Sequence, residues 1–314
     1  MRMSAPNPYV GRSGTRLTRD GALIQFVGFN AFGAAGGCEG APWTAGEIEA
    51  HFAALPPAGL TRTWAFPSTD LGALDTLVAA AGAHGQHLVL TLDNDFDDCT
   101  SSGVKDDRWY AGGYRSSYLD WVRAVAGRYA SSPAVALYEC VNEAGQSRGD
   151  GVLDGPIMRD FYETTAAAIK SVDPYHLVGT GDSAEFVYRD GADGYRIAGS
   201  GPHVDVLSLH DYESDYIDDA PVVSNHYAPC RAAAEALDKP LLVGEMNDGL
   251  SRFPDAAARC ASVVTSVRAY LDDGAAGALV WNRTFTDGAA EPDYAIRGDD
   301  PLIAAIAAWP TPAL

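Results

Sequence analysis

The chain has 314 residues, 47% of them hydrophobic, so it is long enough to bury a large core, and we expect one domain. Its formal net charge of -20 excludes nucleic acid and anionic membrane surfaces as expected partners, because phosphate binding needs clustered Lys and Arg. No stretch approaches the roughly 18 consecutive apolar residues of a membrane span, so no membrane segment is expected.

Short apolar, β-rich segments alternate along the chain with longer Ala-rich amphipathic segments, a pattern typical of βα units around a parallel sheet. Before the first unit, residues 15–23 carry the turn signal Arg19-Asp20-Gly21 and predict a hairpin that caps the base. Eight strands are predicted, the number that closes a (β/α)8 or TIM barrel. They cover residues 25–30, 60–64, 87–93, 135–141, 176–180, 206–210, 241–245 and 278–281.

Helices are predicted between these strands, and the first begins at a capping box formed by Thr44 and Glu47. The helix after the fifth strand is poorly marked. Two long connections, 94–114 and 213–224, follow strand ends at which barrel enzymes build their sites, so we expect them to wall a polar cleft. The predicted helices cover residues 45–55, 71–84, 116–130, 158–172, 226–237, 255–271 and 302–308. Residues 1–314 are expected to form one catalytic domain.

The carboxyl ends of the predicted strands are rich in side chains with chemical function. In a closed barrel these ends meet on one face, so we expect the side chains to surround one site. They are Arg62, Trp64, Asp93, Asn142, Glu143, His210, Tyr212, Glu245 and Trp281. Trp109, in the long third connection, is a further candidate because a sugar ring can stack on its apolar face.

Two glutamates are conspicuous because each ends a buried, apolar strand. Residues 136–143 read Ala-Leu-Tyr-Glu-Cys-Val-Asn-Glu and end at Glu143, and residues 241–245 read Leu-Leu-Val-Gly-Glu and end at Glu245. Glycosidic cleavage with retention needs two carboxyls about 5–5.5 Å apart, one protonated and one ionised. Glu143 and Glu245 are therefore predicted to be the catalytic pair.

These segments resemble the retaining β-glycoside hydrolases of clan A, and family five in particular, which place Asn-Glu on strand four and Glu on strand seven. Residues 60–66, 116–133, 138–143 and 172–178 are similar to the endo-β-1,4-mannanases of that family, in order over nearly the whole chain. The resemblance implies a retaining hydrolase that cleaves β-linked mannan or mannosides by double displacement. It implies a β-linked oligosaccharide or polysaccharide as partner, a monomer, and no metal or organic cofactor.

The resemblance also implies a role for each site residue. Glu143 would be the acid/base, Glu245 the nucleophile, and Asn142 a donor to the substrate 2-hydroxyl. Asp93, Trp64 and Trp109 would contact substrate elsewhere in the cleft.

Arg62 and Tyr212 would keep the nucleophile ionised, because a guanidinium charge and a phenol hydrogen bond both stabilise a carboxylate. Arg62 could equally be a structural partner of Glu139, and the two roles are compatible. By the same resemblance His210 and Trp281 would shape the subsite of the cleaved sugar.

Some residues depart from the family pattern and leave the substrate open. Met246-Asn247 replaces an aromatic residue and Gly after the nucleophile, and Asp93 stands where cellulase-like members have His. An exo-acting β-mannosidase or β-glucosidase, or an endo-β-glucanase, would fit the same barrel. A non-catalytic carbohydrate-binding barrel would have replaced one carboxylate, and a metal-dependent amidohydrolase would need more histidines at strand ends than His210.

The five cysteines show no CxxC spacing, so metal and redox motifs are unsupported. Cys38 and Cys99 fall in loops above the barrel, and Cys230 and Cys260 fall on successive helices. Two disulfides with a free Cys140 would fit a secreted protein whose signal peptide is not part of this sequence, whereas five free thiols would fit a cytoplasmic one. We expect secretion.

Overall fold

The computed structural model describes residues 8–37, 40–96, 99, 103, 105–217, 221–286 and 291–310. Within them, eight parallel strands pair in the order β8-β7-β6-β5-β4-β11-β10-β9. A parallel bridge between Gly179 and Val206 joins the two ends of this order, so the sheet closes on itself. The predicted (β/α)8 barrel is confirmed.

Each strand of the barrel lies within two residues of its predicted position at either end. Residues 60–64 were predicted without error, and the largest differences lie at the carboxyl ends of the third and fourth strands. The strands are β4 (Phe26–Asn30), β5 (Leu60–Trp64), β6 (His87–Thr91), β7 (Val135–Glu139), β8 (Leu177–Gly179), β9 (Leu207–Asp211), β10 (Leu241–Met246) and β11 (Gly277–Val280).

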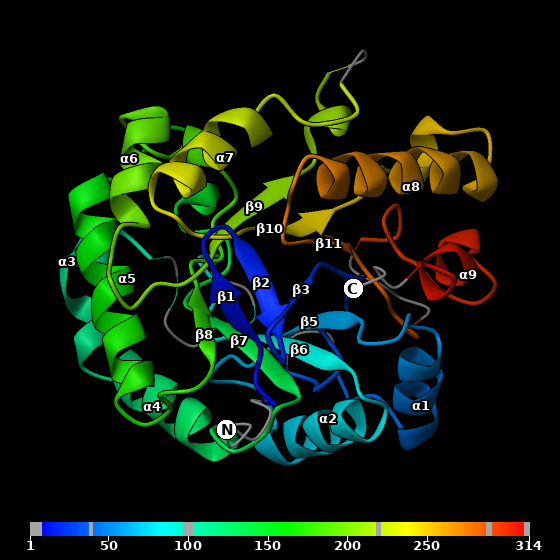
Figure 1. The fold of residues 1–314 in the computed structure, drawn as a ribbon, viewed down its shortest axis with the longest axis horizontal. Helices are drawn as coiled ribbons and strands as arrows, with labels where there is room; N and C mark the ends of the chain where they lie inside the picture. The colour runs from blue at the N-terminus through cyan, green and yellow to red at the C-terminus, as the bar shows by residue number, and fades with distance from the viewer. Residues whose placement is uncertain are drawn as a thin grey trace, which may run out of the picture.

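A ring of helices surrounds the barrel (Figure 1). The seven predicted helices are present, and Thr44 and Glu47 form the predicted capping box. Two helices add to them: α6 follows the fifth barrel strand, where the signal was weak, and α3 lies inside a connection predicted to be a loop. The helices are α1 (Ala45–Ala53), α2 (Leu71–Ala83), α3 (Asp107–Ala111), α4 (Tyr118–Tyr129), α5 (Gly155–Lys170), α6 (Gly191–Ala198), α7 (Tyr227–Ala236), α8 (Ala256–Asp272) and α9 (Pro301–Ala307).

An antiparallel sheet covers one end of the barrel, seen in blue across the centre of Figure 1. It consists of β1 (Gly11–Ser13), β2 (Arg16–Arg19) and β3 (Ala22–Ile24). The predicted hairpin is its β2–β3 part, and β1 is an additional strand paired to β2. Leu17 of β2 is fully buried among the apolar side chains at the base of the barrel, so the sheet closes that end.

The barrel interior changes from apolar at the base to polar at the carboxyl ends of the strands. Phe26, Leu60 and Leu242 belong to the apolar base cluster. Above it, Arg62 and Glu139 are fully buried, and their charges need partners inside the barrel. The polar end is therefore the part of the fold that can hold a reactive site.

The strands approach one another so closely that one position admits no side chain. A Cβ atom on Gly28 of β4 would lie 1.8 Å from the carbonyl oxygen of Leu60 on β5. Glycine at this position allows β4 and β5 to pair in register, which places Asn30 beside Arg62.

The cysteines differ in part from the two-disulfide pattern. Cys99 is disulfide-bonded, whereas Cys140, Cys230 and Cys260 are free. A disulfide between α7 and α8 is therefore wrong: Cys230 is buried with its Sγ 3.3 Å from Glu185 Oε2, and Cys260 lies partly exposed on α8. Cys38 lies outside the described residues.

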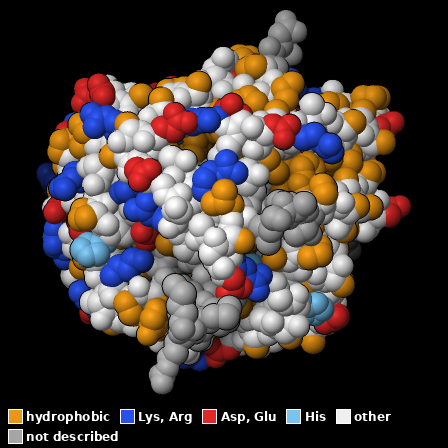
Figure 2. Space-filling model, viewed as in Figure 1, with side chains coloured by type: hydrophobic (Ala, Val, Ile, Leu, Met, Phe, Trp, Pro, Cys, Tyr) orange, Lys and Arg blue, Asp and Glu red, His pale blue; other side chains and the backbone are white. Residues whose placement is uncertain are grey.

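Charge is spread over the outside of the barrel on the face that Figure 2 shows, where acidic and basic side chains are interspersed above the helices. Among the described residues, no helix has the length and apolar character required to cross a membrane.

Candidate active site

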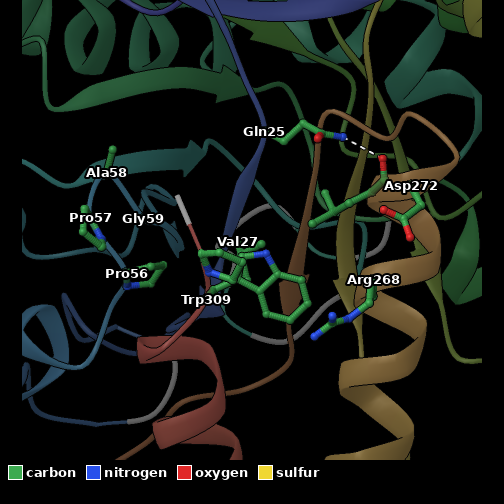
Figure 3. Close-up of a pocket in the computed structure, with 11 residues that line it drawn as sticks. Gln25, Val27, Pro56, Pro57, Ala58, Gly59, Arg268, Asp272 and Trp309 are labelled. Carbon is green, nitrogen blue, oxygen red and sulfur yellow. Dashed lines mark hydrogen bonds between the residues drawn. The ribbon is translucent and has the colours of Figure 1, made fainter. Parts of the chain in front are cut away.

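Two hollows are candidates for a site, and only one of them collects the predicted residues. The smaller, of about 290 Å³, lies at the base between α8, α9 and the start of β4 (Figure 3). Its Gln25 amide donates to the carbonyls of Leu271 and Ala275, both at 2.8 Å, and so fastens the chain rather than facing a ligand. Its described lining holds a single carboxylate, Asp272.

The larger hollow is a cleft of about 580 Å³ at the carboxyl ends of the barrel strands. Six predicted residues line it together with several that the sequence did not indicate. The lining residues are Phe32, Trp64, Asn94, Phe96, Cys99, Asn142, Glu143, Gln146, Tyr212, Tyr216, Glu245, Trp281, Glu291 and Tyr294. Arg62 and His210 lie buried beneath them.

Arg62 lies at the centre of the cleft floor and binds four side chains. Its Nε donates to Glu139 at 2.6 Å, and its Nη1 donates to Glu245 at 2.5 Å and to Asn30 at 3.1 Å. Its Nη2 donates to Asn142 Oδ1 at 2.7 Å. Burial alone would lower the pKa of Arg62, but the carboxylates of Glu139 and Glu245 outweigh it, so the guanidinium stays charged. Arg62 therefore pairs with both Glu139 and Glu245, as the two compatible interpretations of its role expected.

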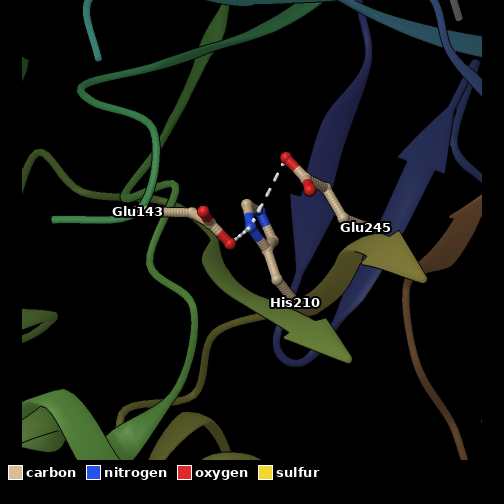
Figure 4. Close-up of side chains that lie close together, drawn as sticks. All are labelled: Glu143, His210 and Glu245. Atoms are coloured by element: carbon tan, nitrogen blue, oxygen red, sulfur yellow. Dashed lines mark hydrogen bonds and ion pairs between the residues drawn. The ribbon is translucent and has the colours of Figure 1, made fainter. Parts of the chain in front are cut away.

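Glu143 and Glu245 approach each other across the ring of His210 (Figure 4). His210 Nδ1 lies 2.8 Å from Glu143 Oε1 and 3.5 Å from Glu245 Oε1. An oxygen of each carboxyl and a ring nitrogen of His210 all lie within 4.8 Å of one another. This separation matches a retaining glycosidase, because an inverting enzyme keeps its carboxyls about 6.5–9.5 Å apart to admit a water molecule.

The hydrogen bonds of the two carboxyls decide which of them holds a proton. Burial raises the pKa of both Glu143 and Glu245 to about 7, and the charge of Glu143 adds to the rise at Glu245. Glu245 accepts from Arg62 and, at 2.9 Å, from the Tyr212 hydroxyl, and both bonds favour its ionised form. Among the described residues, the Glu143 side chain has one hydrogen-bond partner, the neutral His210, so we assign the shared proton to Glu143.

His210 is neutral at the pH values at which these carboxyls titrate, because burial lowers its pKa to about 4. The ring reaches its place through a bulge between β9 and β10 at Gly244. A Cβ on Gly244 would lie 3.0 Å from His210 Nε2, so glycine leaves the room that the imidazole occupies. The strand-end sequence Gly-Glu245 thus serves both the histidine and the carboxylate.

Glu143 has an unusual backbone conformation. Its φ is +49°, in the left-handed region that non-glycine residues rarely adopt. Its N–H donates to Gly181 O at 2.8 Å, and its own carbonyl accepts from the N–H of Gln146 at 3.0 Å. These bonds hold a strained turn that aims the side chain away from β7 and over the cleft.

Glu143, His210 and Glu245 have a spacing at which they could surround a metal ion. Both Glu245 oxygens, however, already accept hydrogen bonds, and the Arg62 guanidinium lies 2.5 Å from one of them. A second cation beside this guanidinium would be repelled, so the set is better suited to holding a proton than a metal.

An aromatic wall stands beside the carboxyls. Trp281 stacks on Phe32 with ring centroids 4.8 Å apart and an interplanar angle of 2°, and Trp64 lies 5.8 Å from Trp281. The amide of Asn247 donates to the carbonyl oxygens of Trp281 and Tyr294. The unusual residue after Met246 therefore ties the end of β10 to the aromatic wall.

Two predicted residues do not reach the cleft. Asp93 is buried and pairs with Lys105 at 3.2 Å, because β6 ends at Thr91 and the alternation of side chains is lost before Asp93. Trp109 lies on α3 and packs against Tyr110 and Phe161 outside the barrel. Neither residue is among those that line the cleft, and substrate contact by either stays a prediction.

Several lining residues were missed. Asn94 follows Asp93 directly, and no pattern in the sequence favours Asn94 over Asp93 as the residue that faces the cleft. Gln146 follows the strained turn at Glu143, and Tyr216, which is 83% exposed at the rim, lies in the long sixth connection that was expected to wall the cleft. Glu291 and Tyr294 belong to the connection after β11, which the pattern did not single out.

Known proteins resemble this chain in sequence and in fold. No model of a protein family matches the chain. A probable mannan endo-1,4-beta-mannosidase F of Neosartorya fischeri is 27% identical over 88% of this chain, and mannan endo-1,4-beta-mannosidase F of Aspergillus fumigatus is 28% identical over 91%. The matches span 64% and 73% of those two proteins.

Two solved structures have the same fold. The endo-1,4-beta-mannanase of Rhizomucor miehei superposes with a TM-score of 0.76 and 21% identity, covering 95% of this chain and 97% of that one. A glycoside hydrolase family 5 mannosidase of the same organism gives a TM-score of 0.66 and 16% identity, covering 94% and 92%. The resemblance indicated by the sequence motifs is confirmed.

We expect Arg62→Met to destabilise the fold by about 3 kcal/mol, because it leaves two buried carboxyls without their cation. The loss should be larger at pH 8 than at pH 5, since those carboxyls can be neutralised by protons at the lower pH. Urea unfolding measures both quantities. Arg123→Met, which removes an exposed arginine of α4, should change stability by at most about 0.5 kcal/mol; equal losses in the two variants would contradict the central role of Arg62.

Proposed function

We propose that this barrel, a relative of the endo-1,4-β-mannanases of glycoside hydrolase family five, is a retaining β-glycosidase that hydrolyses β-linked mannan. The observation that carries the proposal is the pair Glu143 and Glu245. One oxygen of each carboxyl lies within 4.8 Å of the other and of a His210 ring nitrogen, and the two carboxyls have different hydrogen-bond partners. One carboxyl can give a proton while the other attacks, which is the division of labour that retention requires.

In the first step, Glu245 attacks the anomeric carbon and Glu143 donates its proton to the departing glycosidic oxygen. A covalent glycosyl ester forms on Glu245, and the leaving chain departs as an alcohol. In the second step, the ionised Glu143 takes a proton from water, which attacks the same carbon and releases Glu245. Two inversions give net retention.

Arg62 and Tyr212 keep Glu245 ionised before attack. Asn142 has a fixed orientation, because Arg62 can only donate and so faces its Oδ1. Its Nδ2 donates one hydrogen to Asn94 Oδ1 at 3.0 Å and keeps a second for the 2-hydroxyl of the substrate. Such a bond strengthens as charge develops on the sugar ring.

The aromatic wall supplies apolar surface for the sugar. Trp281 and Trp64 line the cleft, and a pyranose stacks on such rings through its C–H face. We also propose secretion, because the disulfide of Cys99 is stable in oxidising compartments.

Action within chains and action at chain ends give different products from mannan. We expect wild-type protein to release a mixture of oligosaccharides, measured by chromatography, and to act weakly on aryl β-mannoside and aryl β-glucoside. Mannose as the sole early product would favour the exo-acting alternative, to which the match with a family 5 mannosidase also points. No turnover of any of these would reject the proposed function.

Removal of the nucleophile should stop the reaction in a way that a small anion can repair. We expect Glu245→Ala to lower turnover of an activated aryl glycoside by about 10⁴-fold or more. Azide or formate should restore part of it and give an α-linked product, because a single displacement inverts the anomeric carbon. NMR of the product tests the configuration, and Glu235→Ala on α7 is the control; full activity of Glu245→Ala would sink the assignment.

The pH dependence should be bell-shaped, since the active pair carries one proton. Activity should fall as pH rises through about 7, because Glu143, whose pKa burial raises to that value, loses the proton that it must donate. It should also fall toward acid pH as Glu245 becomes protonated. The kcat/KM of wild-type enzyme from pH 4 to 9 measures both limbs, and a rate still rising above pH 8 would contradict the role of Glu143.

A further inference from the structure

The cleft contains a third carboxylate that neither reaction step uses. Glu291 lines the cleft and accepts a hydrogen bond from Trp281 Nε1 at 2.5 Å. Trp281 is the residue whose ring stacks on Phe32 beside the reacting carboxyls. We propose that Glu291 is a positioning residue of this reaction: it holds the Trp281 platform, and it places a negative charge in the same cleft as Glu143. This inference rests on the proposed function.

The backbone places Glu291 at the platform. Asn282 N donates to Tyr294 O at 3.3 Å, and Ile296 N donates to Asn282 O at 2.9 Å. A parallel bridge between Arg283 and Ile296 continues this pairing. The segment after Glu291 is thus laid along the end of β11, and Tyr294 N donates to Glu291 O at 3.1 Å to close the turn. The carboxylate belongs to a fixed piece of chain.

One oxygen of Glu291 is engaged and the other is available. Oε2 accepts from the indole N–H, while Oε1 has no hydrogen-bond partner among the described residues. A carboxylate in this state fixes the in-plane rotation of the indole and can accept a hydroxyl of the sugar that stacks on Trp281. An amide in its place would keep the indole bond and lose the charge, so the two effects can be separated by substitution.

The charge matters because Glu143 has several charged or titratable neighbours. Burial is the main cause that raises the pKa of Glu143; Arg62 opposes the rise, and Glu291 and Asp95 add to it. Asp95 is fully buried and fixed by Tyr110 and Ser147, whereas Glu291 is exposed to the cleft. The described groups around Glu143 are Arg62, Asp95, His210, Tyr212, Glu245 and Glu291.

The test uses Glu291→Gln, Glu291→Ala and a control, Asp299→Asn. Asp299 is an exposed acid in the same connection and does not line the cleft. Carboxyl ¹³C NMR on glutamate-labelled protein follows Glu143, whose signal is assigned by its loss in Glu143→Gln. In Glu291→Gln we expect Glu143 to titrate lower by about half a pH unit, because a neighbouring negative charge is gone. In Asp299→Asn it should titrate as in the wild type.

Hydrolysis of mannan provides the second measurement. The basic limb of kcat/KM should move by the same amount in Glu291→Gln, with KM little changed. Glu291→Ala also releases the indole, so we expect its KM to rise about tenfold, the loss of one charged hydrogen bond. Rescue of KM by Gln but not by Ala distinguishes the hold on Trp281 from the charge.

The outcomes separate this inference from the proposed function. An unchanged titration of Glu143 in Glu291→Gln overturns the electrostatic role, and an unchanged KM in Glu291→Ala overturns the hold on Trp281. If the titration of Glu143 shifts in Glu291→Gln but the wild-type protein hydrolyses no mannan, the electrostatic role is supported and the proposed function is rejected.

Discussion

The buried guanidinium of Arg62 cannot be solvated by water, so the protein must surround it with oxygen atoms. It does so with side chains from three other strands and the chain that follows one of them: Asn30 at the end of β4, Glu139 at the end of β7 with Asn142 just after it, and Glu245 on β10. A planar fork with fixed donor directions sets the mutual positions of these strands more tightly than apolar contacts could. Apolar side chains are buried at the base of the barrel, and the Arg62 guanidinium sets the geometry of the other end.

The same constraint explains why two similar carboxyls behave differently. Glu143 and Glu245 are both deeply placed and both have a raised pKa. Only Glu245 touches the guanidinium, and only Glu245 receives the phenol of Tyr212. The asymmetry therefore comes from partners and not from depth. Neutral His210 lies between them and adds no charge that would erase the difference.

The barrel and most of its strand ends could be predicted, because strands and helices leave a periodic pattern of apolar residues in the sequence. The strand at residues 60–64 and the Asn142-Glu143 pair that follows β7 depend on local sequence. Asp93 was misplaced because β6 ends two residues early, and alternation says nothing past a strand end. Trp109 was misplaced because α3 turns its ring toward Phe161. Glu291 follows a connection without periodic signal, and only the fold brings it to Trp281.

Asn247 joins two parts of the cleft that sequence comparison would treat as separate modules. Its amide donates to the carbonyl oxygens of Trp281 and Tyr294, so the strand that carries Glu245 is tied directly to the segment that carries Trp281. Because both acceptors are backbone carbonyls, a segment exchanged for residues 281–296 keeps these bonds only if its backbone follows the same course. The shape of this segment and the residue at position 247 are therefore coupled.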